Sequence, residues 1–293
     1  MSAPVDGFRL AFDRFGSAGS PPVLLLHGWP GHRHDYRNLA PLLSGAADVV
    51  VPDLRGFGGS DKRAPDSHEF YSAAAQARSV AGLVEELGLA NVVIAGYDIG
   101  SRIGQVLARE RRDLVTALVV SPPLAGVGNR VLEPRSRREF WYQAFHQLPL
   151  ADELIDGKPA AVRDYLRYFW NHWSGPGFTI SDEDLDRLLA DYGAPGAFAA
   201  SIAWYRAGAG TVARSVTEHP PDSAQRIAVP TDVLWPGHDP LFPREWSDRL
   251  QEYFDDAHLH FADGVGHFTP LECPREFANL IRRHLDSITG ADS

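Results

Sequence analysis

The sequence predicts an α/β fold in which a mainly parallel central sheet is flanked by helices. Two observations lead to this prediction. Short, continuous apolar runs, typical of strands buried on both faces, alternate with segments of helical periodicity. Strand, helix and strand at these lengths require crossover connections, which join parallel strands. The chain of 293 residues, of which 44% are hydrophobic, is long enough to bury a full core.

Four apolar runs predict strands in the first part of the chain, at residues 22–26, 49–51, 91–95 and 118–120. Between the second and third runs, residues 70–87 predict an amphipathic helix, because apolar side chains recur on one face (Ala77, Val80, Ala81, Val84 and Leu87). The strand pattern returns at residues 231–236 and 257–262, and a final helix is predicted at residues 274–288.

The strand pattern is absent between residues 124 and 216, where the composition shifts to Trp, Tyr, Phe and Arg. Helices are predicted there at residues 132–147, 160–173 and 198–207. Ser181 is a candidate N-cap of a further helix, with Asp184 at its third position. We therefore predict a helical lid, residues 124–216, inserted into a core domain of residues 1–123 and 217–293.

The composition argues against several classes of partner. The formal net charge is −10, from 28 Lys and Arg against 38 Asp and Glu, which disfavours nucleic acid and anionic membrane surfaces. The basic cluster of Arg135, Arg137 and Arg138 is better explained as a solvated helix face. No segment is apolar and long enough to predict a membrane span.

A single cysteine, Cys273, allows neither a disulfide nor a cysteine-based zinc site within one chain. No apolar run follows Met1 that would serve as a signal peptide. A reducing cytoplasm is therefore the expected compartment, and Cys273 is interpreted as a small apolar filler.

The segment Gly96-Tyr97-Asp98-Ile99-Gly100 has the spacing of a nucleophile elbow, with aspartate in the place of the usual serine. A sharp turn from strand to helix strains its central residue, so that the flanking positions must be nearly free of side chains. The helix that begins at Ile99 would direct its first amides toward Asp98. A surface turn is the simpler alternative, since aspartate favours such turns.

Two further strand ends supply a candidate acid, Asp239, and a candidate base, His267. Functional groups of a parallel sheet gather at the carboxyl ends of its strands, so both side chains are expected near Asp98. Asp239 would orient His267, which would activate water; this order along the chain is the one that accompanies the elbow. Asp239 could instead cap the helix that follows it, and His238 is a neighbouring alternative to His267.

The turn His27-Gly28-Trp29-Pro30-Gly31 follows the first predicted strand. It would aim the backbone N–H of Trp29 at the same point as that of Ile99. Two such donors form an oxyanion hole, which stabilises the charge that develops on a carbonyl oxygen.

Together these motifs resemble the α/β-hydrolase superfamily over nearly the whole chain, and within it the soluble epoxide hydrolases. This aspartate-nucleophile branch is shared with haloalkane and haloacetate dehalogenases. The resemblance rests on the H-G-x-P turn at His27, the R-G-x-G-x-S loop of residues 55–60, the aspartate elbow and the Gly-His pair at His267. It implies an α/β-hydrolase fold whose helical lid is inserted after the sixth strand.

The lid contains the sequence contexts of the two epoxide-hydrolase tyrosines. Tyr142 stands in a Tyr-Gln pair ahead of a Gln-x-Pro, and Tyr205 stands in Trp-Tyr-Arg. The resemblance implies that both hydroxyls hold the epoxide oxygen, and a phenol is a credible acid for the alkoxide that ring opening leaves. Packing within an aromatic-rich lid is the alternative for both residues.

The resemblance implies hydrolysis of an epoxide to a vicinal diol through an ester on Asp98, with water as co-substrate and no metal or organic cofactor. Trp29 and three lid aromatics are candidates for the pocket wall and favour a small apolar epoxide, although ordinary packing would also explain them (Trp141, Phe145 and Trp204). The chain is expected to be a monomer or a homodimer.

Two other functions remain open. Haloalkane dehalogenases commonly have Trp directly after the nucleophile and often Asn in the H-G-x-P turn, whereas this chain has Ile99 and Trp29. Haloacetate dehalogenases have Arg after the nucleophile, and only the later Arg102 matches their pattern. The other alternative is a ligand-binding protein with little turnover, although a pure binder does not need nucleophile, acid, base and donors together.

Overall fold

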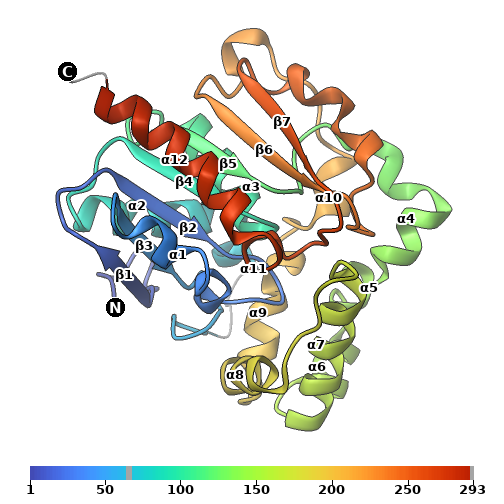
Figure 1. Ribbon diagram of the computed structural model, residues 1–293. Helices are drawn as coiled ribbons and strands as arrows, with labels where there is room; N and C mark the ends of the chain where they lie inside the picture. Colours follow the sequence, from blue (N-terminus) through green and yellow to red (C-terminus); the bar gives the residue numbers. More distant parts are fainter. Residues whose placement is uncertain (64–67, 291–293) are drawn as a thin grey trace.

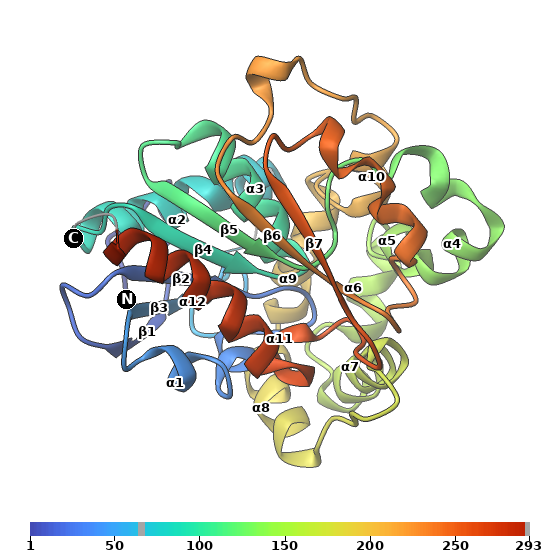
Figure 2. The same cartoon turned by 45° about the horizontal axis from the view of Figure 1, so that its top comes forward.

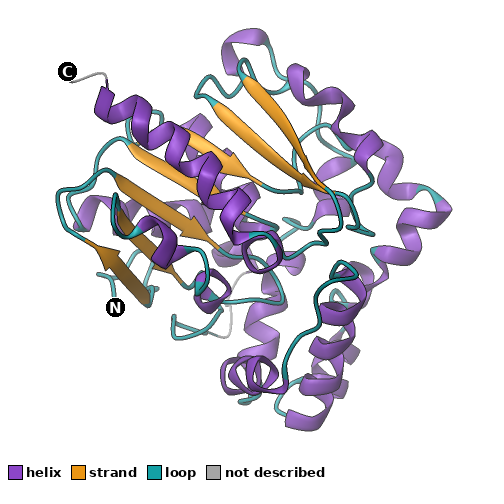
Figure 3. Ribbon diagram, viewed as in Figure 1, coloured by secondary structure: helices purple, strands orange, loops and turns teal. Residues whose placement is uncertain are grey.

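The computed structural model describes residues 1–63 and 68–290, which form a seven-stranded sheet covered by helices (Figures 1 and 3). The strands lie in the order β1-β3-β2-β4-β5-β6-β7; β1 is antiparallel to β3 and the remaining pairs are parallel. The predicted α/β fold with a mainly parallel sheet is thus confirmed. The strands are β1 (Phe12–Gly16), β2 (Pro22–Leu26), β3 (Asp48–Pro52), β4 (Val92–Gly96), β5 (Val115–Val120), β6 (Thr231–Pro236) and β7 (Ala257–Ala262).

The central strands are buried along almost their whole length, as their continuous apolar runs predict. Three strands, β2, β6 and β7, have the predicted bounds. The edge strand β1 was not among the predicted strands, because its sequence FDRFG mixes apolar and charged residues and its side chains are half-buried or exposed.

Helices cover both faces of the sheet (Figure 2). One face is crossed by α12 (Pro274–Gly290), with α1 (Ala40–Leu43) beside it, and the other packs against α3 (Ile99–Glu110), with α2 (Ala73–Glu86) beside it. The predicted amphipathic helix is α2, which buries the expected face toward the core (Ala77, Val80, Ala81 and Val84). Three 3-10 helices and one short α-helix complete this part of the chain. The 3-10 helices are η1 (Arg33–Tyr36), η2 (His68–Tyr71) and η5 (Arg244–Glu252), and the α-helix is α11 (Thr269–Glu272).

The chain between β5 and β6 is helical and lies beyond the carboxyl ends of the strands (Figure 1). Its division from the sheet as a lid of residues 124–216 remains a prediction. Its helices are η3 (Gly128–Leu132), α4 (Pro134–Glu139), α5 (Trp141–Phe145), α6 (Pro149–Ile155), α7 (Pro159–Trp173), α8 (Asp182–Tyr192), α9 (Ala197–Arg206), α10 (Thr211–Ser215) and η4 (Ser223–Gln225).

The helical segment follows the fifth strand of the described chain rather than the sixth. The reason lies at the N-terminus. Asp6 and Gly7 both have positive φ angles, so the chain turns back on itself and makes only an isolated bridge between Val5 and Phe8. The sheet therefore begins with β1.

Two details of the helical segment differ from the predictions. A single helix at residues 132–147 is wrong, because the chain bends at Phe140, where φ is −88° and ψ is 12°, and continues as separate helices α4 and α5. Helices α6 and α10 were not predicted. The expected cap is confirmed: the Ser181 hydroxyl accepts a hydrogen bond from the backbone N–H of Asp184, at 3.1 Å, at the start of α8.

Three simpler predictions can be compared with the structure. Arg135, Arg137 and Arg138 lie exposed on α4, as expected for a solvated helix face. Cys273 is buried, and burial raises the pKa of its thiol, as fits a filler. Across residues 1–63 and 68–290, none of the helices has the length and apolarity that crossing a membrane requires.

Candidate active site

Asp98 lies at the turn between β4 and α3, with φ 49° and ψ −122°, a conformation that non-glycine residues rarely adopt. The two neighbouring glycines are required by close approach. A Cβ atom on Gly100 would lie 1.9 Å from the Leu26 carbonyl oxygen, and one on Gly96 would lie 2.7 Å from the carbonyl carbon of Gly100. At Gly104 the nearest atom, on Ile94, would be 3.3 Å away, so the third glycine is less constrained.

The turn after β2 meets this elbow directly. A Cβ atom on Gly28 would lie 2.3 Å from the Asp98 Cβ, so only glycine lets the turn come this near. The backbone N–H of Trp29 consequently donates to Asp98 Oδ1 at 2.7 Å. Ile99 is the first residue of α3, so its N–H is one of the amides that have no partner within the helix.

His267 and Asp239 lie where the strand order predicts, beside Asp98. His267 Nδ1 is 2.7 Å from Asp239 Oδ2, and His267 Nε2 is 3.4 Å from Asp98 Oδ2. Asp239 Oδ1 also accepts from the Leu241 N–H at 2.8 Å, so Asp239 stabilises its own turn while it contacts the imidazole. The alternative, His238, is exposed to solvent.

The charges around His267 determine its protonation. Burial disfavours the imidazolium, but the carboxylates of Asp239 and Asp98 outweigh this effect and raise the pKa of His267 to about 10. At neutral pH the unreacted site therefore contains an imidazolium between two carboxylates.

The loop that carries His267 is bound to the end of α7. The His267 N–H donates to the Trp173 carbonyl oxygen at 2.8 Å. The Glu272 carboxylate accepts from the N–H groups of Gly175, at 2.8 Å, and Gly266, at 2.7 Å. A Cβ atom on Gly266 would lie 2.2 Å from the Gly175 nitrogen, so the two backbones are in contact.

The two tyrosines come from α5 and α9 and meet above Asp98. Tyr142 and Tyr205 are both buried, with ring centroids 5.6 Å apart and planes at 89°. Burial raises the pKa of both phenols well above the ordinary value, so both are neutral at pH 7. The Gln143 Nε2 donates to the Tyr142 hydroxyl at 3.1 Å, which lowers the pKa of Tyr142 but does not offset the effect of burial.

Asp98 and both tyrosines line one small cavity of about 10 Å³, which has room for roughly one water molecule. Trp204, a candidate for the pocket wall, also lines it, and its role in substrate binding stays a prediction. The Trp29 ring stacks on Tyr142, with centroids 5.4 Å apart and planes at 8°. The cavity is lined by Asp98, Ile99, Arg102, Pro123, Tyr142, Gln143, Trp204, Tyr205, Ala209 and Thr211.

The other two aromatic candidates lie outside this cavity. Trp141 is 39% exposed and lines a larger pocket on the far side of Gln143 and Tyr205. Phe145 packs against Trp141 and Tyr165. It is not among the residues that line either space.

Arg102 and Gln143 line the cavity although the sequence assigned neither of them a role in epoxide chemistry. Arg102 Nη1 donates to Glu218 Oε1 at 3.2 Å, whereas its Nε and Nη2 have no partner in the described part of the chain. Arg102 stands four residues after Asp98, on the same face of α3, and that spacing could have identified it. Nothing in the sequence links Glu218 to Arg102.

Among the described residues there is no group of three or more His, Cys, Asp and Glu side chains that could hold a metal ion. The groups that the site does contain are carboxylates, an imidazole, phenols and backbone amides. Together they place carboxylates, an imidazole, two phenols and two backbone amides close to one another.

Comparison with known proteins identifies the family of this chain. A family model described as the alpha/beta hydrolase fold matches residues 21–274. The chain is 30% identical to a fluoroacetate dehalogenase of a Burkholderia species, over 92% of this chain and 88% of that protein. It is 28% identical to a soluble epoxide hydrolase of Corynebacterium strain C12, over 93% and 92%. The solved structure of the epoxide hydrolase CorEH without ligand superposes with a TM-score of 0.84, 26% identity and 98% coverage of both chains.

Proposed function

The chain belongs to the alpha/beta hydrolase fold family and is a hydrolase, and on that premise we propose that it converts an epoxide to a vicinal diol. The observation that carries the proposal is the pair of neutral phenols, Tyr142 and Tyr205, facing the Asp98 carboxylate across one cavity. A carboxylate opposite two proton donors suits the opening of a strained ring ether. The substrate would be a small apolar molecule, with water as co-substrate and the cytoplasm as the expected compartment.

In the first step, Asp98 Oδ2 attacks a carbon of the epoxide ring. The bond from that carbon to the ring oxygen breaks, and a tyrosine hydroxyl gives its proton to the alkoxide, leaving a phenolate. Asp98 Oδ1 stays on the Trp29 N–H, to which it is 2.7 Å distant, and becomes the carbonyl oxygen of the ester. Protonation by a positioned side chain contributes roughly 10²–10⁴-fold to such a step.

Ester formation changes the state of His267. Asp98 loses its charge, so one of the two carboxylates that raise the pKa of His267 no longer acts. The imidazolium then returns a proton to the phenolate, and the neutral imidazole can act as a base. Asp239 remains bound to Nδ1 and keeps Nε2 directed at the ester.

In the second step, His267 takes a proton from water, and the resulting hydroxide adds to the ester carbonyl carbon. The oxyanion is stabilised by the N–H groups of Trp29 and Ile99. The bond to the alcohol then breaks, the Asp98 carboxyl gives its proton to the departing alkoxide, and the diol leaves. Asp98 carboxylate, His267 imidazolium and neutral phenols are thereby restored.

A single turnover in ¹⁸O-labelled water tests this route, with enzyme in excess over styrene oxide. Passage through an ester predicts an unlabelled diol and one ¹⁸O atom in the peptide that contains Asp98, both read by mass spectrometry. A labelled diol from the first turnover would mean that water attacks the epoxide directly, and would overturn the role of Asp98.

Haloacid dehalogenation is the second candidate, and Arg102 favours it. Its buried guanidinium has two nitrogens without a partner in the described residues and lines the cavity beside Asp98, where it could bind the carboxylate of a haloacid. The similarity to a fluoroacetate dehalogenase supports the same reading. Halide release from fluoroacetate or chloroacetate, without diol from any epoxide, would replace the first proposal by this one.

A further inference from the structure

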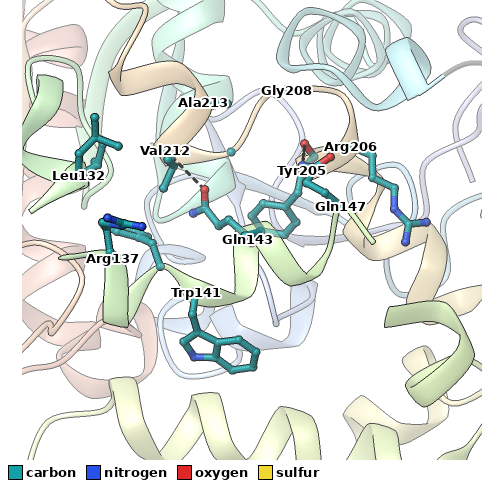
Figure 4. A pocket seen from close by; sticks show the side chains of 14 residues that line it. Leu132, Arg137, Trp141, Gln143, Gln147, Tyr205, Arg206, Gly208, Val212 and Ala213 are labelled. Carbon is teal, nitrogen blue, oxygen red and sulfur yellow. Dashed lines mark hydrogen bonds between the residues drawn. The ribbon is translucent and has the colours of Figure 1, made fainter. Parts of the chain in front are cut away.

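A large pocket lies next to the catalytic cavity, between η3, α4 and α5 on one side and α9 and α10 on the other (Figure 4). Its volume of about 580 Å³ falls within the roughly 300–1,000 Å³ typical of ligand sites. We call it the outer pocket. Most of its wall is apolar and comes from Leu132, Phe140, Trp141, Ala144, Val212 and Ala213.

The outer pocket and the catalytic cavity share two lining residues, Gln143 and Tyr205. Gln143 is 6% exposed and is held at both ends of its amide. Its Oε1 accepts from the Val212 N–H at 3.0 Å, and its Nε2 donates to the Tyr142 hydroxyl at 3.1 Å. Figure 4 shows this side chain between Tyr205 and Val212. Gln143 is therefore part of a partition one side chain thick.

For an organic epoxide to react at Asp98, the partition between the two spaces must open. A cavity of about 10 Å³ holds about one water molecule and no organic epoxide. The substituent of a substrate whose ring reaches Asp98 must lie elsewhere, and the outer pocket is the adjoining space large enough for it.

Of the two partition residues, Gln143 is the one that can move at low cost. The Tyr205 ring packs against the rings of Tyr142, Trp29 and His146, and Gln147 Nε2 donates to the Tyr205 carbonyl oxygen at 2.6 Å. Gln143 has two neutral hydrogen bonds, and water in the outer pocket could replace both for its amide.

We propose that the outer pocket binds the apolar substituent of the epoxide, and that Gln143 is the gate which swings aside to join this pocket to the space at Asp98. The inference rests on the proposed function and adds its substrate class, epoxides with an aryl group or an alkyl chain. Two basic residues line the outer pocket, Arg206 and Arg137. Arg206 is occupied by Asp152, at 2.9 Å, and by the His146 carbonyl oxygen, at 2.8 Å, and Arg137 is an exposed residue of α4, so most of the wall stays apolar.

Filling the pocket tests the proposal. Ala144 is an exposed residue of α5 that lines the outer pocket, and Ala144→Trp would occupy its volume. The ratio of kcat/KM for 1,2-epoxyoctane to that for propylene oxide should fall about tenfold or more, because several methylenes lose their contact surface. Ala213→Trp fills the same pocket from α10 and should act in the same direction. A matched control is Ala160→Trp, an exposed position of α7 outside the pocket, which should leave the ratio within twofold.

The gate has a separate test. Gln143→Ala removes the partition and should raise the same ratio severalfold, mainly through a lower KM for 1,2-epoxyoctane. An unchanged ratio in Gln143→Ala would overturn the assignment of the gate. An unchanged ratio in both filling variants would overturn the assignment of the pocket.

A binding measurement separates this inference from the proposed function. Titration of the wild type and Ala144→Trp with 1,2-octanediol, followed by calorimetry, needs no turnover. Binding weakened about tenfold in the variant supports the pocket even if no epoxide is hydrolysed, in which case only the proposed function fails. Equal affinity in both proteins would refute the pocket.

Discussion

Two aspartate–histidine pairs connect β6 and β7 or the loops that follow them, one beyond the carboxyl ends of the strands and one within the strands, and the pairs differ in what surrounds them. At the carboxyl end, Asp239 Oδ2 lies 2.7 Å from His267 Nδ1. Toward the amino end, Asp232 Oδ1 lies 2.6 Å from His260 Nε2. The residue types and distances are the same within a tenth of an ångström, so neither can explain why one pair is suited to catalysis.

The two pairs differ in the surroundings of the histidine and of its second imidazole nitrogen. His267 is fully buried, and its Nε2 lies 3.4 Å from Asp98 Oδ2. His260 is 31% exposed in its side chain, and Asp232 is shared with His284, at 2.9 Å. Asp232 therefore ties α12 to the sheet, whereas Asp239 contacts the histidine that the proposed mechanism uses as its base. The proposed catalytic role of the Asp239–His267 pair thus rests on the contact between His267 Nε2 and Asp98, not on the pair alone.

The largest effect is expected from removing the carboxylate of Asp98. Asp98→Ala removes the nucleophile and should lower kcat for diol formation by about a thousandfold or more, because no ester can form. Asp232→Asn, at the other end of β6, should leave kcat within about twofold. Steady-state turnover of styrene oxide measures both. Substantial turnover by Asp98→Ala would remove Asp98 from the mechanism.

The second prediction compares the two histidines. His267→Gln should form the ester and hydrolyse it about a hundredfold or more slowly, since its base is absent. Intact-mass analysis after mixing with styrene oxide should show one substrate mass, which peptide mapping places on Asp98. His260→Gln is the matched control and should show no adduct. Rapid release of diol by His267→Gln would contradict the role of His267.

The third prediction concerns the helices above the site. Tyr142→Phe and Tyr205→Phe should each slow ester formation by about ten- to a hundredfold, because one hydroxyl partly replaces the other, and the double variant should be slower still. Hydrolysis of the ester should change little, because the phenols act in the first step. Single-turnover kinetics separates the two steps. Equal slowing of both steps would point to packing rather than proton donation.

Asp232→Asn should instead cost stability, about 1–3 kcal/mol in the free energy of unfolding at pH 7. Burial raises the pKa of Asp232, but hydrogen bonds from His284 and His260 outweigh this and lower it overall. A lowered pKa stabilises the folded state above the unfolded value of about 4, and this contribution is lost as the pH falls further. Urea unfolding at pH 7 and pH 3.5 should show the difference between variant and wild type shrinking in acid.

His267 predicts the opposite pH dependence. Its folded pKa of about 10 lies above the unfolded value of about 6.5. Its contribution to stability is therefore complete below about pH 6.5 and is lost as the pH rises toward 10. Thermal unfolding of the wild type should weaken over this range more than that of His267→Gln. Parallel curves would indicate that His267 is neutral in the folded protein.

The sequence predicted what depends on local pattern and chain order. Apolar runs gave the bounds of β2, β6 and β7, and the positions after strands brought Asp98, Asp239 and His267 to one edge. It did not predict Gln143 as a partition, because that contact depends on how α5 packs against α10. The bend at Phe140 was missed for a related reason, since helical periodicity continues across it.

The backbone contact between residues 173–175 and the His267 loop has a consequence for protein engineering. Because Glu272 receives hydrogen bonds from both Gly175 and Gly266, the end of α7 and the catalytic loop are one mechanical unit. A chimaera that takes its helical segment from a relative would disturb His267 if the foreign segment replaced Gly175, where a Cβ atom would lie 2.4 Å from the Gly264 oxygen. Grafts that keep residues 173–175 with their parent sheet should exchange substrate preference while preserving the base.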